Sequence, residues 1–402
     1  MRLTHLSLTN FRNYARLELM LPESKPVLIV GQNAQGKTNL LEAIYYLAAI
    51  KSPYTQHDRQ LIHWRTENEP IPFARIAGDI QTREHTSARL EITLMIERVG
   101  ETGGRFRKVI RLNGVEKRAL DVIGTFNVVL FLPQDLTLIE GGPSDRRRFI
   151  DDTLGQVDAV YAQALETYEK VLPQRNALLR RIAERSANAK ELPYWDEQIA
   201  QAGAVIIAGR QRFLREMEYD AQKSHYDLTG RREMLTMRYQ PSFAPTAEGN
   251  GQLSFGALGL DLHRDIDPAR IVPQFLARLK DEQAESIARG ATVSGPHRDE
   301  LRLLINDRDI GLYGSRGQAR TAVMACKLAE LSWMRERIGE WPVLLLDEVA
   351  AELDASRRAY LLERIDGVTQ TLATTTEQDI FTTQFLERAA LWRVTEGELA
   401  AE

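Results

Sequence analysis

An eight-residue loop near the N-terminus constrains this chain more than any other feature. The residues from Gly31 to Thr38, GQNAQGKT, match the pattern G-x-x-x-x-G-K-[ST]. A short apolar run typical of a buried strand precedes the loop at 26–30, and an apolar helix is expected at 39–49. In this setting a glycine-rich backbone can approach phosphate groups, and the helix N-terminus directs free N–H groups at them. The alternative, a chance glycine-rich turn, is disfavoured by the two flanking elements.

The loop predicts a cradle for ATP and Mg²⁺. Lys37 is expected to contact the β- and γ-phosphates, and the Thr38 hydroxyl is expected to ligate Mg²⁺. The predicted nucleotide-binding residues of this segment are Gly31, Gln32, Asn33, Ala34, Gln35, Gly36, Lys37, Thr38 and Asn39.

A second apolar run, 342–346, ends in two carboxylates, Asp347 and Glu348. Beside a phosphate loop, Asp347 is expected to hold Mg²⁺ indirectly, by contacting the groups that bind the metal ion. Glu348 is expected to orient or deprotonate the attacking water, so it is the principal catalytic candidate together with Lys37. A strand that ends at an exposed acidic pair is a common alternative, but the presence of the phosphate loop disfavours it.

Three further motifs have the order found in ABC ATPases. The segment with Ser315, Gly317 and Gln318 opens a helix over 319–335 and resembles the ABC signature, which binds the γ-phosphate held by a second copy of the protein. Ser315 and Gln318 also form an ordinary capping box, and both interpretations can hold together. Asp354 matches the D-loop at the interface between two heads. Gln134 follows a strand at 126–132 and suits the Q-loop, which senses Mg²⁺, although an exposed loop glutamine is an equal alternative.

The remaining pattern predicts an α/β domain interrupted by helices. Apolar positions from Ile150 to Val171 repeat every 3 or 4 residues, a helical seam that Pro173 should kink or interrupt. A polar break at 186–193 and a second seam from Trp195 to Met217 predict an antiparallel hairpin. Other expected elements are strands at 73–80, 88–97, 107–112, 234–239 and 301–305, a hairpin turn at 113–114, a loop at 244–252 and a helix at 273–289.

These patterns give a fold class and a domain division. The expected fold is an ABC-type P-loop ATPase head built from both chain ends, with an inserted α-helical hairpin lobe. The head comprises 1–140 and 286–402, and the helical second lobe, with a small α/β part, comprises 141–285.

The chain resembles the RecF family of bacterial recombination mediators. The segments that carry the resemblance are NFRNY (10–14), GKTNLLEAIYYL (36–47), LPQDLTLIEGGPSDRRRFID (132–151), RGATVSGPHRDEL (289–301), YGSRGQARTAVMACKLAEL (313–331) and LLLDEVAAELD (344–354). The resemblance implies DNA binding at junctions of single and double strands, ATP-driven homodimerisation and slow, DNA-stimulated hydrolysis. It also implies work with RecR, in a pathway with RecO, to place RecA on gapped DNA, with Arg12 and Asn13 contacting the nucleotide.

The sequence departs from the family pattern at two places. Ala34 stands where the family has glycine, and it is expected to avoid a positive φ and to reshape the loop slightly. Tyr54 stands where the family has arginine after Ser52, so no phosphate or DNA role is assigned there.

DNA binding must come from local patches, because 52 basic and 56 acidic residues give a net charge of −4. The candidates lie on the first long helix: Arg146, Arg148, Arg180, Arg181 and Arg185. A solvated helix face is the ordinary alternative for any one of them. His297, in GPHRDEL, is expected to be a structural hydrogen-bonding residue, since no second metal ligand lies at suitable spacing.

Cysteine content and the length of the apolar runs limit the possible location and function of the protein. The single cysteine, Cys326, excludes an intrachain disulfide, and no apolar run approaches the length of a membrane span. A cytoplasmic, nucleoid-associated protein without a membrane partner is expected. The competing functions are a transporter ATPase, which the missing switch histidine at Thr374–Thr376 disfavours, and a Rad50- or SMC-type tether, for which the hairpin is too short. A DNA clamp without hydrolysis is disfavoured by Glu348.

Overall fold

The computed structural model describes residues 1–23, 26–67, 69–84, 87–99, 103–243 and 266–401. The predicted loop at 244–252 lies outside these residues. The chain forms two compact units, and each is described by itself. The first unit comprises residues 1–135 and 330–402, and the second comprises residues 136–329.

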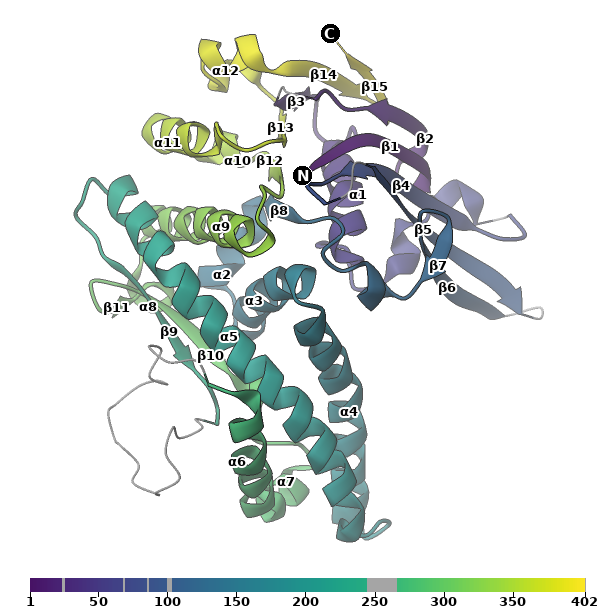
Figure 1. Cartoon of the computed structure of the whole chain (residues 1–402), viewed down its shortest axis with the longest axis vertical. Coiled ribbons are helices and arrows are strands. Elements are labelled where there is room, and N and C mark those ends of the chain that lie inside the picture. The colour runs from purple at the N-terminus through teal and green to yellow at the C-terminus, as the bar shows by residue number, and fades with distance from the viewer. Residues whose placement is uncertain (24–25, 68, 85–86, 100–102, 244–265, 402) are drawn as a thin grey trace. The chain divides into compact units, whose positions relative to one another are not determined.

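A largely parallel sheet forms the centre of the first unit (Figure 1). Its strand order is β15-β14-β3-β13-β12-β8, and only β15 runs antiparallel to its neighbour. The strands are β3 (Val27–Val30), β8 (Val128–Phe131), β12 (Val343–Asp347), β13 (Thr371–Thr375), β14 (Ala390–Thr395) and β15 (Glu398–Ala401). Every residue of β3, β8, β12 and β13 is buried, and the first three of these strands coincide with the continuous apolar runs of the sequence.

The first unit also contains an antiparallel sheet with the order β2-β1-β4-β5-β6-β7. The strands are β1 (Arg2–Phe11), β2 (Tyr14–Met20), β4 (Phe73–Gln81), β5 (Ala88–Val99), β6 (Gly103–Leu112) and β7 (Val115–Lys117). The predicted turn between β6 and β7 is confirmed, because Asn113 and Gly114 both have positive φ, at 52° and 82°.

Helix α1 (Lys37–Ala49) joins the two sheets into one core. It contacts strands of both sheets, and its residues Leu40, Leu41 and Ile44 are fully buried in the same cluster as side chains from β1, β3 and β12. The phosphate loop therefore lies at the carboxyl edge of the parallel sheet, between β3 and the start of a firmly packed helix. The unit also contains α10 (Val349–Glu352), α11 (Ala355–Ile365) and α12 (Thr383–Arg388).

The second unit is built on the predicted helical hairpin. Helices α4 (Ala159–Ala183) and α5 (Leu192–Leu228) lie side by side, preceded by α2 (Thr137–Glu140) and α3 (Pro143–Val157) (Figure 1). Gly203 and Gly209 of α5 allow close packing, since a Cβ there would lie 2.7 Å from the Phe275 ring and 2.6 Å from the Tyr161 ring. Pro173, expected to kink or interrupt the helix, lies inside α4 and does not interrupt it. The interruption falls at Asp158, whose side chain caps α4 by accepting a hydrogen bond from the Tyr161 N–H.

A small antiparallel sheet completes the second unit. Its order is β11-β10-β9, with β9 (Leu235–Gln240), β10 (Glu300–Ile305) and β11 (Arg308–Asp309). The helix expected at 273–289 is two helices, α6 (Pro268–Asp281) and α7 (Gln283–Arg289), and they are followed by α8 (Ile310–Tyr313) and the first part of α9 (Arg316–Ile338).

The boundaries of the units differ from the sequence-based division. Residues 286–329 lie in the unit with the helices rather than in the head, because β10 pairs along its whole length with β9. The first boundary falls at 135/136 rather than at 140/141. Within the described part of the chain, no helix combines the length and the apolar character that crossing a membrane requires.

Candidate nucleotide-binding site

The phosphate loop is shaped by close backbone contacts. A Cβ at Gly31 would lie 2.7 Å from the Val394 carbonyl oxygen, and a Cβ at Gly36 would lie 2.6 Å from the Asn13 amide nitrogen. Gly36 also has a φ of +115°, which favours glycine. The two motif glycines are therefore required by the shape of the loop itself.

Ala34 corrects one expectation. It has a φ of +65°, although a residue with a Cβ was expected to avoid this region. The neighbouring residue, Gln35, is held on both sides: its carbonyl oxygen accepts hydrogen bonds from the Asn13 side chain at 3.1 Å and from the Gly397 N–H at 3.1 Å. These contacts keep the loop in the left-handed geometry that the motif needs, at a local cost of about 1 kcal/mol for Ala34.

Lys37 is buried and points back over its own loop. Its ammonium group donates to the carbonyl oxygens of Gly31 at 2.7 Å and Gln32 at 3.0 Å, and it lies 3.0 Å from a carboxylate oxygen of Glu348. The Lys37 side chain is only 3% exposed, whereas that of Glu348 is 34% exposed. The charge of Lys37 therefore lies against its own loop, with partners that an anionic phosphate could replace.

Asp347 is the centre of a polar cluster at the end of β12. Its Oδ1 accepts hydrogen bonds from the Thr38 hydroxyl at 3.2 Å and the Thr374 hydroxyl at 2.7 Å. Its Oδ2 accepts a hydrogen bond from the Tyr54 hydroxyl at 3.0 Å. Burial and the neighbouring Asp347 carboxylate raise the pKa of Tyr54, so the phenol stays protonated and donates. A hydroxyl and a carboxylate so close together are the oxygen ligands that suit Mg²⁺.

Glu348 has an unusual backbone conformation. Its φ is +55°, and its N–H donates to the Thr374 hydroxyl at 3.0 Å. A left-handed conformation at a non-glycine residue costs of order 1–3 kcal/mol and is concentrated at functional sites. Together with its exposure, this geometry turns the Glu348 carboxylate out of the buried strand and toward the Lys37 ammonium.

The two residues carried over from the NFRNY segment lie beside the loop. Asn13 accepts a hydrogen bond from the Asn39 amide at 2.8 Å, so it braces the first turn of α1. The Arg12 guanidinium is paired through two hydrogen bonds, at 2.7 and 2.8 Å, with the buried Glu42 carboxylate. Arg12 thus has a strong protein partner, and a contact with nucleotide stays a prediction.

Gln134 lies in a turn after β8 and is exposed. Because Phe131 pairs in parallel with Leu346, the turn leaves the sheet at the edge where Asp347 stands. Asp354 is the N-cap of α11, and hydrogen bonds from the Arg357 N–H and the Ser356 hydroxyl lower its pKa. These positions are compatible with the predicted roles of both residues, which stay predictions.

Ser315, Gly317 and Gln318 belong to the second unit, at the start of α9. The predicted capping box is confirmed: the Gln318 N–H donates to the Ser315 hydroxyl at 3.2 Å, and the Ser315 N–H donates to the Gln318 side chain at 2.9 Å. Gln318 also donates to Glu233 at 2.9 Å. Ser315 and Gly317 are exposed, whereas Gln318 is partly buried.

Comparison with known proteins adds the family. The model of the RecF/RecN/SMC N terminal domain matches residues 2–397. The DNA replication and repair protein RecF of Chloroflexus aurantiacus is 40% identical over 409 residues, which cover 99% of each protein. The protein of the same name from Bacillus subtilis is 35% identical over 401 residues, covering 99% of this chain and 100% of that protein. The chain belongs to the RecF family.

Solved structures agree with this assignment. A structure of the recombination mediator protein RecF with ATPrS has a TM-score of 0.84 at 29% identity and covers 100% of this chain and 98% of that one. An Smc head matches with a TM-score of 0.53 at 15% identity, covering 100% of this chain and 97% of that one, which shows a common fold alone. The predicted fold class, an ABC-type α/β head with a helical lobe, is confirmed.

The GPHRDEL motif of this RecF-family chain builds a buried ionic cluster in the second unit. The Arg210 guanidinium donates to Asp151 at 2.8 and 2.9 Å and to Asp299 at 3.3 Å. Asp299 also accepts a hydrogen bond from the Tyr239 hydroxyl, and burial raises its pKa. The expectation of a structural role for His297 is confirmed, because its ring lies between the Tyr168 hydroxyl at 2.7 Å and the Thr292 carbonyl at 3.1 Å. Burial lowers the pKa of His297 to about 4.

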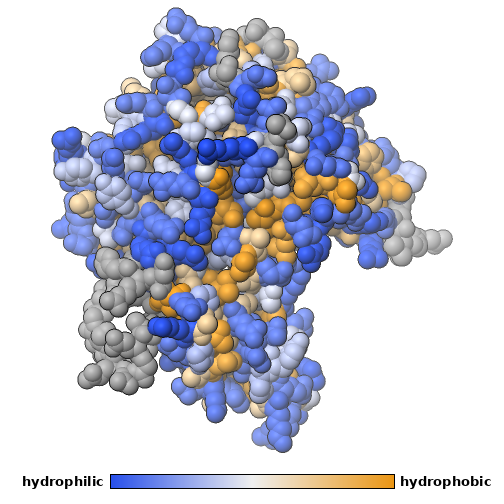
Figure 2. All heavy atoms as spheres, in the orientation of Figure 1, coloured by the Kyte–Doolittle hydropathy of each residue, from blue (hydrophilic) through white to orange (hydrophobic). Residues whose placement is uncertain are grey.

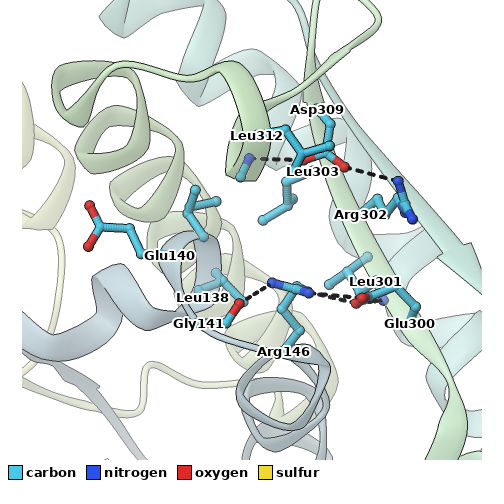
Figure 3. Close-up of a pocket in the computed structure, with 12 residues that line it drawn as sticks. Leu138, Glu140, Gly141, Arg146, Glu300, Leu301, Arg302, Leu303, Asp309 and Leu312 are labelled. Carbon is cyan, nitrogen blue, oxygen red and sulfur yellow. Dashed lines mark hydrogen bonds and ion pairs between the residues drawn. The ribbon is translucent and has the colours of Figure 1, made fainter.

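The five DNA-binding candidates occupy different surroundings. Arg146 faces a cavity of about 240 Å³ (Figure 3), where its guanidinium is paired with Glu300 at 2.7 and 2.8 Å and with the Gly141 carbonyl at 2.8 Å. Arg148 is 56% exposed, with Asp145 4.0 Å away. Arg180, Arg181 and Arg185 are exposed at the hairpin end, where Figure 2 shows a hydrophilic surface, and no residue that the structure describes forms an ion pair with them. The last three are the better candidates for phosphate contacts.

Sequence reasoning missed four contributors to the site. Glu42, Tyr54 and Thr374 contact predicted residues directly, and the Glu396-Gly397 turn between β14 and β15 supports the loop through Gln35. The position of Glu42 on α1 offered one signal, since a charged residue inside an apolar helix needs a partner. The other three depend on sheet order and could not be found from spacing.

Proposed function

We propose that this protein is an ATP-controlled DNA-binding repair factor that acts as a recombination mediator. In this proposal Mg-ATP binds at the phosphate loop, two copies dimerise around it, and slow hydrolysis, stimulated by DNA, releases the dimer. The observation that carries the proposal is the convergence of Lys37, Thr38, Asp347 and Glu348 at one sheet edge. The names of full-length relatives as DNA replication and repair proteins, and of a structural match as RecF-ATP, support it.

The chain's own residues suggest the division of labour. Lys37 would neutralise phosphate charge, and Thr38 with Asp347, aided by Gln134, would hold Mg²⁺. Bound Mg²⁺ would supply electrostatic stabilisation of the transferring phosphoryl group. Glu348, one-third exposed and 3.0 Å from the Lys37 ammonium, would orient or deprotonate the water.

The assignment of the signature residues to the second unit is compatible with dimerisation. Ser315, Gly317 and Gln318 lie in a different compact unit from the phosphate loop, at an exposed helix N-terminus suited to an anion. We propose that they, with Asp354, face the nucleotide held by a second copy. ATP would then shift the equilibrium toward the dimer by its higher affinity for that state.

The proposed DNA substrate is a gap with a junction of single and double strands. Arg180, Arg181 and Arg185 would contact backbone phosphates, which carry no sequence information. RecR would be a direct partner, with RecO and RecA in the same pathway. This activity would place the protein in the cytoplasm at the nucleoid.

The test is fluorescence anisotropy of a labelled gapped DNA, titrated with protein in Mg-ATP and without nucleotide. Much tighter binding with ATP, lost in Lys37→Ala, is expected. Equal binding in both conditions would show that the nucleotide does not control DNA affinity.

A salt series separates the DNA contacts from the nucleotide site. Arg180, Arg181 and Arg185 replaced together by Gln should reduce the slope of log K against log salt by about 2 to 3, since each phosphate contact contributes about 0.9. ATP binding should be unchanged in this variant. An unchanged slope would remove the hairpin end from the proposed DNA surface.

A further inference from the structure

The segment that follows α1 reaches the metal-binding end of β12. Tyr54 occupies this segment, and its hydroxyl donates to Asp347 Oδ2 at 3.0 Å. The other oxygen, Oδ1, is bound by the Thr38 and Thr374 hydroxyls. Each carboxylate oxygen of Asp347 is therefore held by its own donors, which come from three different parts of the first unit.

Tyr54 is itself fixed by a short chain of contacts. The Ser52 hydroxyl oxygen accepts hydrogen bonds from the Tyr54 N–H at 3.0 Å and the Thr55 N–H at 3.1 Å. The same hydroxyl donates to the buried Glu42 carboxylate. Glu42 is held in turn by the two hydrogen bonds from Arg12. A continuous path of hydrogen bonds thus leads from Arg12, beside the phosphate loop, to Tyr54.

A carboxylate held on both oxygens has little freedom to rotate about its Cβ–Cγ bond. Rotation matters here because Mg²⁺ accepts only a narrow, near-octahedral arrangement of ligands, which the Asp347 carboxylate is expected to orient from behind. Removing the donor on Oδ2 leaves Thr38 and Thr374 on one side only. Asp347 is 4% exposed, so little water is at hand to replace the lost donor.

We propose that Tyr54 is a positioning residue for Asp347: it holds Oδ2 so that the carboxylate stays aligned with Thr38 for Mg²⁺. The inference rests on the proposed Mg-ATP site and adds a residue to which neither the motifs nor the family pattern assigns a role. Tyr54 acts through Asp347 and touches no substrate. Ser52 contributes indirectly, since it sets the backbone of Tyr54.

The experiment measures binding of a fluorescent ATP analogue to the full chain while Mg²⁺ is varied. Tyr54→Phe removes only the hydroxyl, and it should raise the Mg²⁺ concentration at half-maximal binding about threefold to tenfold. Binding of the analogue in EDTA should be unchanged, a separation that a general folding defect would not give. Ser52→Ala should produce a smaller shift in the same direction.

Tyr219→Phe is the matched control, because Tyr219 is an exposed tyrosine on α5 in the other unit. An unchanged Mg²⁺ requirement in Tyr54→Phe, beside Mg²⁺-dependent binding by the unaltered protein, overturns this inference alone. A lower requirement also overturns it, since the hydroxyl would then compete with the metal. Absence of nucleotide binding by the unaltered protein overturns both the inference and the proposed function.

Discussion

The two units each contain a cluster of charged side chains built from a family motif, but the clusters are closed to different degrees. In the first unit Lys37 is buried and donates two hydrogen bonds to loop carbonyls, whereas its partner Glu348 is one-third exposed. In the second unit Arg210 and Asp299 are 3% and 1% exposed, and Asp151 is 14% exposed. The first cluster can exchange partners with a ligand, and the second cannot.

This difference separates two kinds of motif. GKT and LLLDE meet at the edge of the parallel sheet, where Glu348 is one-third exposed and the backbone is strained at Ala34 and Glu348. GPHRDEL supplies Asp299 and His297 to an enclosed network that ties β10 to α4, α5 and β9. Both motifs mark the family, yet only the first has the exposure that ligand binding needs.

Arg210→Ala should have the largest effect on stability. It would leave Asp151 and Asp299 buried without their cation, at a cost of about 3–5 kcal/mol. Thermal unfolding should shift downward by roughly 10 °C. Arg212→Ala, on the same helix but without an ion pair among the described residues, should shift it little. An equal shift in both variants would show that the ion pairs of Arg210 add no particular stability.

Lys37→Ala should have the opposite profile. ATP affinity, measured by calorimetry, should fall by roughly 100-fold or more because the phosphate charge loses its buried cation. The unfolding temperature should change little, since water can reach Gln32 and Glu348, two of the partners that Lys37 leaves behind. Lys223→Ala, an exposed lysine on α5, provides the control. Unimpaired ATP binding in Lys37→Ala would contradict the assignment of the Lys37–Glu348 cluster as the nucleotide-binding site.

His297 gives the second cluster a pH dependence. Its pKa is about 4 when folded and about 6.5 when unfolded, so its contribution is complete above pH 6.5 and is lost as the pH falls toward 4. Between pH 7 and 5 this loss is about 2 kcal/mol. The unfolding temperature should therefore drop by about 4 °C more in the unaltered protein than in His297→Gln. Identical pH profiles would mean that His297 titrates normally.

Ala34→Gly should produce the smallest effect. Glycine removes the strain of a positive φ but gains freedom in the unfolded chain, so the expected stabilisation is at most about 1 kcal/mol. Urea unfolding measures it directly. A clear loss of stability would show that the Ala34 methyl group makes a favourable contact that offsets its strain.

The sequence predicted the residues of the site better than the contacts between them. Lys37 and Thr38 could be found from the phosphate-loop pattern, and Asp347 and Glu348 because they end a continuous apolar run. The ends of parallel strands meet at one edge. The antiparallel hairpin of α4 and α5 followed from the spacing of apolar residues. An interruption at Pro173 is not found, because packing of Tyr168 and Leu178 on both sides keeps α4 continuous.

What could not be predicted depends on contacts between distant segments. Tyr54 reaches Asp347 across 293 positions in the sequence, and Gly397 reaches Gln35 because β14 pairs with β3. The strand at 301–305 was found, but its pairing with β9 was not, so residues 286–329 were placed with the head. Spacing identifies residues in one segment, whereas register across sheets decides which segments meet.

Sedimentation velocity of Glu348→Gln, with Mg-ATP and without nucleotide, tests the proposed ATP control most directly. The substitution keeps the size of the side chain but removes the carboxylate that would act on water, so ATP should remain bound. A dimer with Mg-ATP and a monomer without it is the predicted result. A monomer in both conditions would contradict ATP-driven dimerisation, and a dimer in both would show that the nucleotide does not control assembly.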